Sequence, residues 1–137
     1  MRVSFEYLVS CFLICFITAL APVYAQKPPA NYPYVTLNVI NFQKELATQE
    51  GIVLDVRTPA EFAQGHLPNA ININYQDPDF EQAIKNLKAD QPYFIYCAKG
   101  GRSAKACAQL KANKLKKVYN LEGGLAAWQQ AGQVVVK

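Results

Sequence analysis

One segment constrains the fold of this chain more than any other: an apolar strand that gives way to a glycine-containing loop and then to a helix. The run Tyr93–Tyr96 ends at Cys97, the loop Ala98–Gly101 follows, and an alanine-rich helical pattern covers Ser103–Ala112. A strand that is apolar at every position is typical of a parallel sheet with helices on both faces. Ligands of such sheets bind outside the carboxyl ends of the strands. The segment therefore predicts a functional site at Cys97.

Strand-like and helix-like segments alternate along the rest of the chain. Strands are predicted at Val35–Leu37, Ile52–Leu54, Ala70–Ile73, Tyr93–Tyr96 and Lys117–Asn120, with Val134–Val136 as an edge strand or a docked segment. Helices are predicted at Ile40–Ala47, Pro59–Phe62, Asp79–Leu87, Ser103–Ala112 and Leu125–Gln130. This alternation predicts an α/β three-layer domain, in which a central, mainly parallel sheet of about five strands carries helices on both faces.

Two of these helices have predicted boundaries and contacts. The first helix has Ile40, Phe42 and Leu46 as its core contacts, and Gly51 is expected to end it. The second helix has Thr58 as its expected N-cap, followed by a proline at the first helical position.

The first 25 residues have the pattern of a signal peptide. Arg2 supplies a positive start, Tyr7–Leu20 is almost wholly apolar, and Val23–Ala25 has small residues where cleavage requires them. An uncleaved membrane anchor is the alternative, but the apolar run is shorter than the ~20 residues that a spanning helix needs. We therefore expect a signal peptide at 1–25, a flexible lead-in at 26–34 and one domain at 35–137, exported to a bacterial periplasm without stable membrane insertion after cleavage.

Only two cysteines would remain after export, Cys97 and Cys107, since Cys11 and Cys15 lie in the signal. An oxidising compartment favours one disulfide between them. The helical spacing opposes this pairing, because it places Cys107 on one stripe with Ser103. We therefore expect Cys107 to be a buried core residue.

Basic residues are in modest excess but unevenly distributed. No acidic residue occurs between Gln91 and Leu121. Within this stretch Lys99 and Arg102 belong to the loop, where a positive field would attract a small anion and stabilise a thiolate. Nucleic-acid binding is not predicted, because an exported domain without interleaved aromatic residues lacks the usual features.

The loop has the properties of an anion cradle. Gly100 and Gly101 allow backbone amides to turn inward, so the amides can surround a thiolate and any group attached to it. Arg102 can hold the loop or face an incoming anion, and Ser103 can cap the helix. A nucleophilic thiolate within amide donors suits the transfer of a soft atom such as sulfur.

A metal site and a histidine base are not predicted. His66 is the only histidine of the chain, and no cluster of carboxylates or cysteines accompanies it. It lies between a helix end and a strand, where we expect it to hydrogen-bond the backbone rather than to activate Cys97.

Four stretches of this sequence resemble the single-domain rhodanese family of sulfurtransferases. They are Leu54–Phe62, Gly65–Ile73, Tyr96–Ser103 and Asn120–Trp128, and they occur in the family's order over almost all of the expected domain. The resemblance implies a rhodanese-like fold, no cofactor, and a Cys97 persulfide formed from an anionic donor such as thiosulfate. Cyanide or a thiol, including one on a partner protein, would then accept the sulfur.

The resemblance also assigns roles to the residues of these stretches. The loop residues Ala98, Lys99, Gly100, Gly101, Arg102 and Ser103 would bind the sulfonate and then the persulfide. A structural role is implied for Asp55, Arg57, Glu61, His66, Gly123, Gly124 and Trp128. Within this second group Arg57 is expected to pair with Glu61 one turn further on. Asn69 stands where the family more often has glycine, and asparagine also tolerates a left-handed backbone.

Three other functions compete with sulfur transfer. The domain could be a non-enzymatic sulfur carrier or a partner-binding module. Thiol–disulfide exchange would use Cys97 and Cys107, although they form no Cys-x-x-Cys pair. Phosphatases that share the fold have one more residue between the cysteine and the arginine than the four found between Cys97 and Arg102. The shorter loop favours a sulfur atom over a tetrahedral phosphate.

Overall fold

The computed structural model of the chain describes residues 34–137. The predicted signal peptide and the lead-in up to residue 33 lie outside the described residues. Tyr34, which the sequence places at the end of the lead-in, is only 7% exposed and packs against the core. Within this described part, no helix combines the length and the apolar character needed to cross a bilayer.

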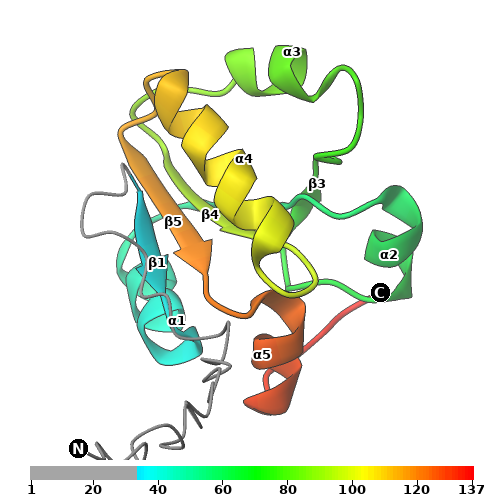
Figure 1. Cartoon of the computed structure of the whole chain (residues 1–137). Helices are drawn as coiled ribbons and strands as arrows, with labels where there is room; N and C mark the ends of the chain where they lie inside the picture. The colour runs from blue at the N-terminus through cyan, green and yellow to red at the C-terminus, as the bar shows by residue number, and fades with distance from the viewer. Residues whose placement is uncertain (1–33) are drawn as a thin grey trace, which may run out of the picture.

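A sheet of five parallel strands forms the centre of the domain (Figure 1). Its strands are β1 (Val35–Leu37), β2 (Ile52–Asp55), β3 (Ile71–Asn72), β4 (Pro92–Tyr96) and β5 (Lys117–Leu121), in the spatial order β1-β5-β4-β2-β3. Because β4 lies between β5 and β2, its side chains are covered on both faces, and Tyr93 to Tyr96 are all buried. The predicted α/β fold is confirmed.

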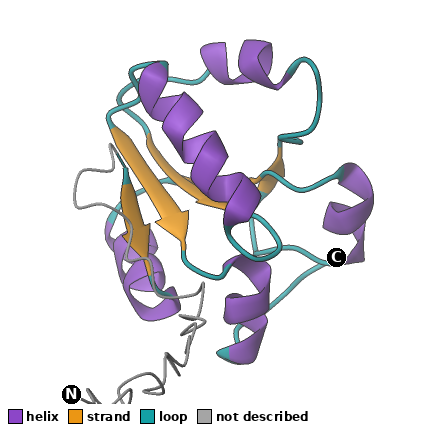
Figure 2. Cartoon of the chain, in the orientation of Figure 1, coloured by secondary structure: helices purple, strands orange, loops and turns teal. Residues whose placement is uncertain are grey.

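The described residues 34–137 form five helices, and all but the second pack on the two faces of the sheet (Figure 2). They are α1 (Val39–Thr48), α2 (Pro59–Gln64), α3 (Phe80–Lys85), α4 (Gly101–Ala112) and α5 (Gly124–Gln130). Ile84 of α3 and Leu110 of α4 belong to one core cluster, whereas Phe42 of α1 and Trp128 of α5 belong to another. The pairs α3–α4 and α1–α5 therefore pack on opposite faces.

Helix α1 differs from the prediction at both ends. It begins at Val39 with Asn38 as its N-cap, and the Asn38 side chain accepts a 2.9 Å hydrogen bond from the amide of Asn41. Val39 and Phe42 are buried, but Ile40 is 76% exposed, so its assignment as a core contact was wrong. The helix faces the sheet through the positions 39, 42 and 46, which are spaced by three and four residues.

Gly51 also has a different role from the predicted one. The helix ends at Thr48, three residues before Gly51, with Gln49 as its C-cap. A side chain at Gly51 would collide with the ring of Phe94, so the glycine allows close packing under the sheet instead. Phe94 in turn contacts Phe42 edge to face, at a centroid distance of 5.3 Å.

The carboxyl-terminal segment docks on the domain rather than adding a strand. Val136 and His66 exchange two backbone hydrogen bonds of 2.9 Å in an isolated antiparallel bridge. The indole nitrogen of Trp128 donates a 2.8 Å bond to the carbonyl of Val134. These contacts tie the segment to both α5 and the turn after α2.

Candidate active site

The carboxyl ends of β4 and β2 form the switch point of the sheet. The chain leaves β4 towards β5 and leaves the adjacent β2 towards β3, in opposite directions along the sheet. The two following loops diverge, which leaves room for a ligand between them. Cys97 follows β4 directly, and Val56 follows β2, so the predicted nucleophile lies at this point.

The loop after Cys97 turns into α4 earlier than the sequence predicts. Helix α4 begins at Gly101, and its N-cap is Gly100 in the left-handed region at φ 104°. The prediction that Ser103 caps the helix was therefore wrong. Ser103 lies inside the first turn, and its hydroxyl donates a 3.1 Å hydrogen bond to the carbonyl of Gly100. Only glycine adopts the required backbone at position 100 at low cost.

Helix α5 holds the outer side of this loop, which lies directly above it in Figure 1. The amide of Leu125 donates a 2.8 Å hydrogen bond to the carbonyl of Cys97, and the amide of Ala126 donates a 3.0 Å bond to the carbonyl of Ala98. Gly124 has φ 58°, and any side chain there would overlap the Cys97 carbonyl. The glycine therefore permits a close approach that turns the loop carbonyls towards α5.

The loop amides point the other way, towards the sulfur. The amide of Gly100 donates a 3.1 Å hydrogen bond to Sγ of Cys97. Burial raises the pKa of this thiol, but the Ser103 hydroxyl and the amides of Ser103, Gly100 and Lys99 outweigh burial and lower the pKa below its ordinary value. The Ser103 proton can serve either the Gly100 carbonyl or the sulfur, and an ionised sulfur is the stronger acceptor.

Cys97 lies at the floor of the loop and not on the surface. The residue is 1% exposed and packs in the same core cluster as Ala106 and Cys107. The lowering of its pKa thus depends on the local donors and not on contact with water. A reagent has to enter between the loop amides to reach the sulfur.

Arg102 does not point at an open anion site. Its Nη1 and Nη2 atoms donate to the two carboxylate oxygens of Glu61 at 2.8 and 2.7 Å. The predicted pair between Arg57 and Glu61 was therefore wrong. Glu61 is turned away by its capping box with Thr58, in which its carboxylate accepts from the Thr58 amide at 3.0 Å.

Arg57 is instead the partner of Asp55. Nη2 of Arg57 lies 2.6 Å from Oδ2 of Asp55, and it also donates to the carbonyl of Gly65 at 2.7 Å. Burial opposes the charge of Arg57, but the hydrogen bond with Asp55 outweighs this, and the pKa of Arg57 is raised. Asp55 and Arg57 are 0% and 4% exposed, so the pair is a buried brace at the end of β2.

Tyr96 completes this brace, and sequence reasoning missed it. Its hydroxyl accepts a 3.0 Å hydrogen bond from the amide of Leu67. Burial and the Asp55 carboxylate raise the pKa of Tyr96. The sequence signal for this contact was a tyrosine at the end of an otherwise apolar strand, because a buried hydroxyl needs a hydrogen-bond partner.

Two lysines give the loop its free positive charge. Lys99 in the loop and Lys105 in α4 are exposed, and neither forms an ion pair with another residue of the 34–137 region. Gly101 is also exposed, and a side chain there would meet nothing within 4 Å. The approach to the loop is thus open and cationic.

His66 contacts α2 and the carboxyl-terminal segment. Its ring stacks on Phe62 at a centroid distance of 3.8 Å, and Nδ1 lies 3.0 Å from the carbonyl of Leu67. This agrees with the expected backbone role. Across the described residues, no group of three or more His, Cys, Asp or Glu side chains could hold a metal ion.

Cys107 is a free, fully buried thiol, as the helical spacing predicts. Burial and the nearby charge of Cys97 raise the pKa of Cys107. The two cysteines therefore differ in kind, because their surroundings favour the thiolate at Cys97 and the neutral thiol at Cys107.

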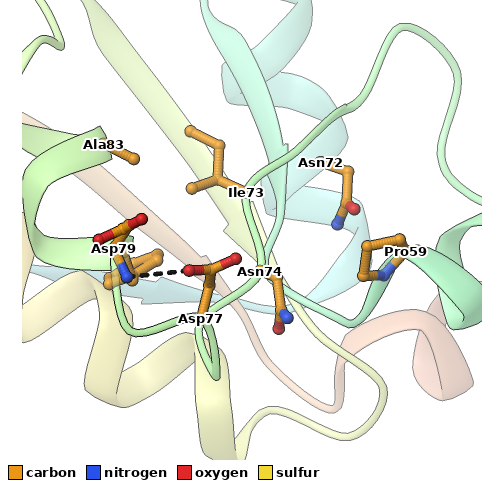
Figure 3. Close-up of a pocket in the computed structure, with 8 residues that line it drawn as sticks. Pro59, Asn72, Ile73, Asn74, Asp77, Asp79 and Ala83 are labelled. Carbon is orange, nitrogen blue, oxygen red and sulfur yellow. Dashed lines mark hydrogen bonds between the residues drawn. The ribbon is translucent and has the colours of Figure 1, made fainter.

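A separate cavity of about 310 Å³ lies between β3 and α3 (Figure 3). It is lined by Pro59, Asn72, Ile73, Asn74, Asp77, Asp79, Phe80 and Ala83. Figure 3 shows Ile73 across from Ala83, with the side chains of Asp77 and Asp79 below them. The two exposed carboxylates disfavour an anionic ligand in this cavity, and Cys97 does not line it.

Comparison with known proteins places this geometry in a family. A family model described as the rhodanese-like domain matches residues 40–131. A sulfurtransferase of Allochromatium vinosum is 35% identical over 94 residues, which cover 69% of this chain and 86% of that protein. A thiosulfate sulfurtransferase of Pseudomonas putida is 36% identical over 87 residues, which cover 62% of this chain and 76% of that protein.

Solved structures agree with the sequence relatives. The crystal structure of a rhodanese-related protein from Thermoplasma volcanium matches with a TM-score of 0.66 and 34% identity, covering 75% of this chain and 98% of that one. Cys97 lies at the switch point of a parallel sheet with a lowered pKa, and the family model covers most of the described residues. With these relatives, the chain belongs to the rhodanese-like domain family.

Proposed function

We propose that this protein is a sulfurtransferase that carries a sulfane sulfur on Cys97, from an anionic donor such as thiosulfate to cyanide or a thiol. The observation that carries the proposal is the Gly100 amide 3.1 Å from Sγ, within a set of donors that lowers the pKa of Cys97. The relatives named as sulfurtransferases support the same reaction type.

The proposed reaction has two displacement steps. The Cys97 thiolate attacks the outer sulfur of thiosulfate, the S–S bond of the donor breaks, and sulfite leaves with the bonding electrons. The resulting persulfide keeps its negative charge near the loop amides. The acceptor then attacks the terminal sulfur, which gives thiocyanate from cyanide or a persulfide from a thiol, and the Cys97 thiolate returns.

The first step needs no general base once Cys97 is ionised, and the lowered pKa of Cys97 favours that form. This fits a site in which His66 contacts the backbone and Phe62. The exposed ammonium of Lys99 adds a charge that attracts the donor.

A sulfur carrier for a partner protein is the second candidate. The floor position of Cys97, at 1% exposure, favours it, because a persulfide there would be protected from solvent. A carrier would hold sulfur on Cys97 yet turn over slowly with cyanide.

Steady-state thiocyanate formation from thiosulfate and cyanide tests the proposal. We expect turnover in the wild-type protein, no turnover in Cys97→Ser, and retained turnover in Cys107→Ala, the matched change at the other cysteine. Equal rates in wild type and Cys97→Ser would reject the proposal that Cys97 carries the sulfur in an enzymatic reaction. A mass increase of about 32 Da, lost in Cys97→Ser, would show one sulfur atom on Cys97. This adduct without turnover would identify a carrier instead of an enzyme.

The same variants test thiol–disulfide exchange. A disulfide-exchange function needs both cysteines, so Cys107→Ala would abolish reduction of a protein disulfide by the reduced chain. We expect no such reduction in the wild-type protein, because the pKa of the buried Cys107 thiol is raised.

We also propose that the chain is exported and that cleavage after Ala25 releases the domain. The apolar run Tyr7–Leu20 and the small residues before Gln26 support this. Expression of the full chain in a bacterium, followed by fractionation and intact mass, tests it. A periplasmic product starting at Gln26 is expected, and a full-length product in the membrane fraction would show a retained anchor.

A further inference from the structure

Glu61 and Arg102 join the two elements that diverge at the switch point. Glu61 lies on α2, which follows β2, and Arg102 lies on α4, which follows β4. Their side chains form a two-bond ion pair with distances of 2.8 and 2.7 Å. The pair is only 33% and 25% exposed, so it is partly shielded from water. It bridges the elements that follow the inner strands β2 and β4, beside the Cys97 loop.

Glu61 is the fixed member of this pair. Its carboxylate accepts hydrogen bonds of 3.0 Å from both the amide and the hydroxyl of Thr58, in the capping box of α2. Because these bonds hold the carboxylate at the first turn of α2, Arg102 has to reach across to meet it. Arg102 is the second residue of α4, directly after the loop.

The pairing leaves Arg102 little capacity for a substrate anion. Both terminal nitrogens of its guanidinium, which bind carboxylates and sulfonates in a two-bond geometry, already face Glu61. The charge of Arg102 is compensated at short range by the same carboxylate. The exposed ammonium of Lys99 has no such partner in the part of the chain that the structure describes.

We infer, on the basis of the proposed sulfur transfer, that Glu61 is a positioning residue: through Arg102 it fixes the Cys97 loop and withholds the guanidinium from the donor anion. The donor is then received by Lys99 and the loop amides. In this arrangement Arg102 makes the loop rigid, whereas Lys99 provides the positive charge that selects the anionic donor.

The variant Glu61→Gln separates these roles. Glutamine at this position preserves the capping box, so α2 remains formed, while the charge on the pair is lost. The released Arg102 becomes an additional receptor, so we expect the KM for thiosulfate to fall about 3-fold or more while kcat falls by a similar factor as the loop loosens.

A double variant makes the inference sharper. Glu61→Gln with Arg102→Gln removes both charges, and the pair is already neutral as a whole in the wild-type protein. We expect its KM for thiosulfate to stay within about 2-fold of wild type, whereas Lys99→Met raises this KM by about 10-fold. If Arg102 received the donor, the double variant would show the large increase in KM.

Glu81→Gln is the matched control. Glu81 forms an exposed ion pair of 3.2 Å with Lys85 on α3, away from the Cys97 loop. This variant loses the same charge on a helix, so its kinetic constants are expected to equal those of the wild-type protein.

Hydrogen exchange of the segment 97–103 gives a readout that does not depend on turnover. We expect faster amide exchange of this segment in Glu61→Gln than in wild type or Glu81→Gln. If the wild-type protein transferred no sulfur, the proposed function would fail, yet this exchange comparison would still decide whether Glu61 fixes the loop. Unchanged exchange, or a KM that rises in Glu61→Gln, would overturn the inference.

Discussion

The amide of Leu125 donates a 2.8 Å hydrogen bond to the carbonyl oxygen of Cys97, so the first turn of the last helix holds the residue that carries the thiol. This bond and its neighbour at Ala126 fix the orientation of the loop peptides. With the carbonyls bound to α5, the amides are directed at Sγ. The site of Cys97 is therefore built from two regions that are far apart in the sequence.

Replacement of Gly124 tests this relationship. In Gly124→Ala the new methyl group would overlap the Cys97 carbonyl and lie 2.9 Å from the carbonyl carbon of Ala98, so the loop has to shift. We expect kcat for sulfur transfer to fall at least about 10-fold, because a displaced amide no longer stabilises the charged sulfur. Steady-state kinetics provides the measurement.

Gly132→Ala is its control. Gly132 also has a positive φ, 70°, but a side chain there meets nothing within 4 Å. Only the backbone strain of about 1 kcal/mol should appear, as a lower melting temperature with normal kcat. Equal losses of activity in the two variants would show that strain, and not the contact with the loop, matters.

The buried pair of Asp55 and Arg57 is expected to act on stability. Asp55→Asn leaves the guanidinium of Arg57 buried without its carboxylate, which should lower the free energy of unfolding by about 3–5 kcal/mol. Urea unfolding measures this loss. Asp90→Asn removes an ion pair with Lys116 whose side chains are 81% and 70% exposed, and it should leave the urea midpoint close to that of the wild-type protein. A fully stable Asp55→Asn protein without activity would point to a chemical role instead.

Ionisation of Cys97 should be visible in its reactivity. An unperturbed cysteine reaches half its maximal rate of alkylation by iodoacetamide at a pH of about 8.5. Because the pKa of Cys97 is lowered, Cys97 should reach this point at a lower pH. Ser103→Ala removes one donor to the charged sulfur and should move this midpoint to a higher pH. Peptide mapping after alkylation assigns the reaction to Cys97, and a midpoint that does not move would exclude Ser103 as a donor.

Acid should weaken the domain through Glu61. The hydrogen bond from Arg102 lowers the pKa of Glu61 from 4.5 to about 2. A lowered carboxyl pKa stabilises the folded state fully above pH 4.5, and this contribution is lost as the pH falls through 2. The effect should amount to only about 1 kcal/mol, since the pair is partly exposed. Wild type and Glu61→Gln should therefore differ in unfolding free energy at pH 6 and converge near pH 2.

Local patterns were sufficient to predict the order and type of the elements. Alternating strand and helix signals gave the parallel sheet, and the strand–loop–helix segment gave the position of Cys97. The burial of Cys107 also followed from helical spacing alone. These features depend on residues within a few positions of one another, where backbone propensity and periodicity act.

The ion-pair partners could not be derived in the same way. Arg57 and Glu61 are four residues apart and at helical spacing, yet each pairs elsewhere, with Asp55 and Arg102. The N-cap of α4 is Gly100 and not the predicted Ser103 for a related reason. The left-handed backbone of Gly100 is set by the loop, which packs on α5.

The amino-acid sequence alone thus determined the fold class, the thiol and the glycines that its loop requires, because these follow from residue chemistry and short-range geometry. The tertiary structure decided which charges meet and how deeply Cys97 is buried. Those outcomes depend on the crossover connections of the sheet, which bring α2, α4 and α5 together around one strand end.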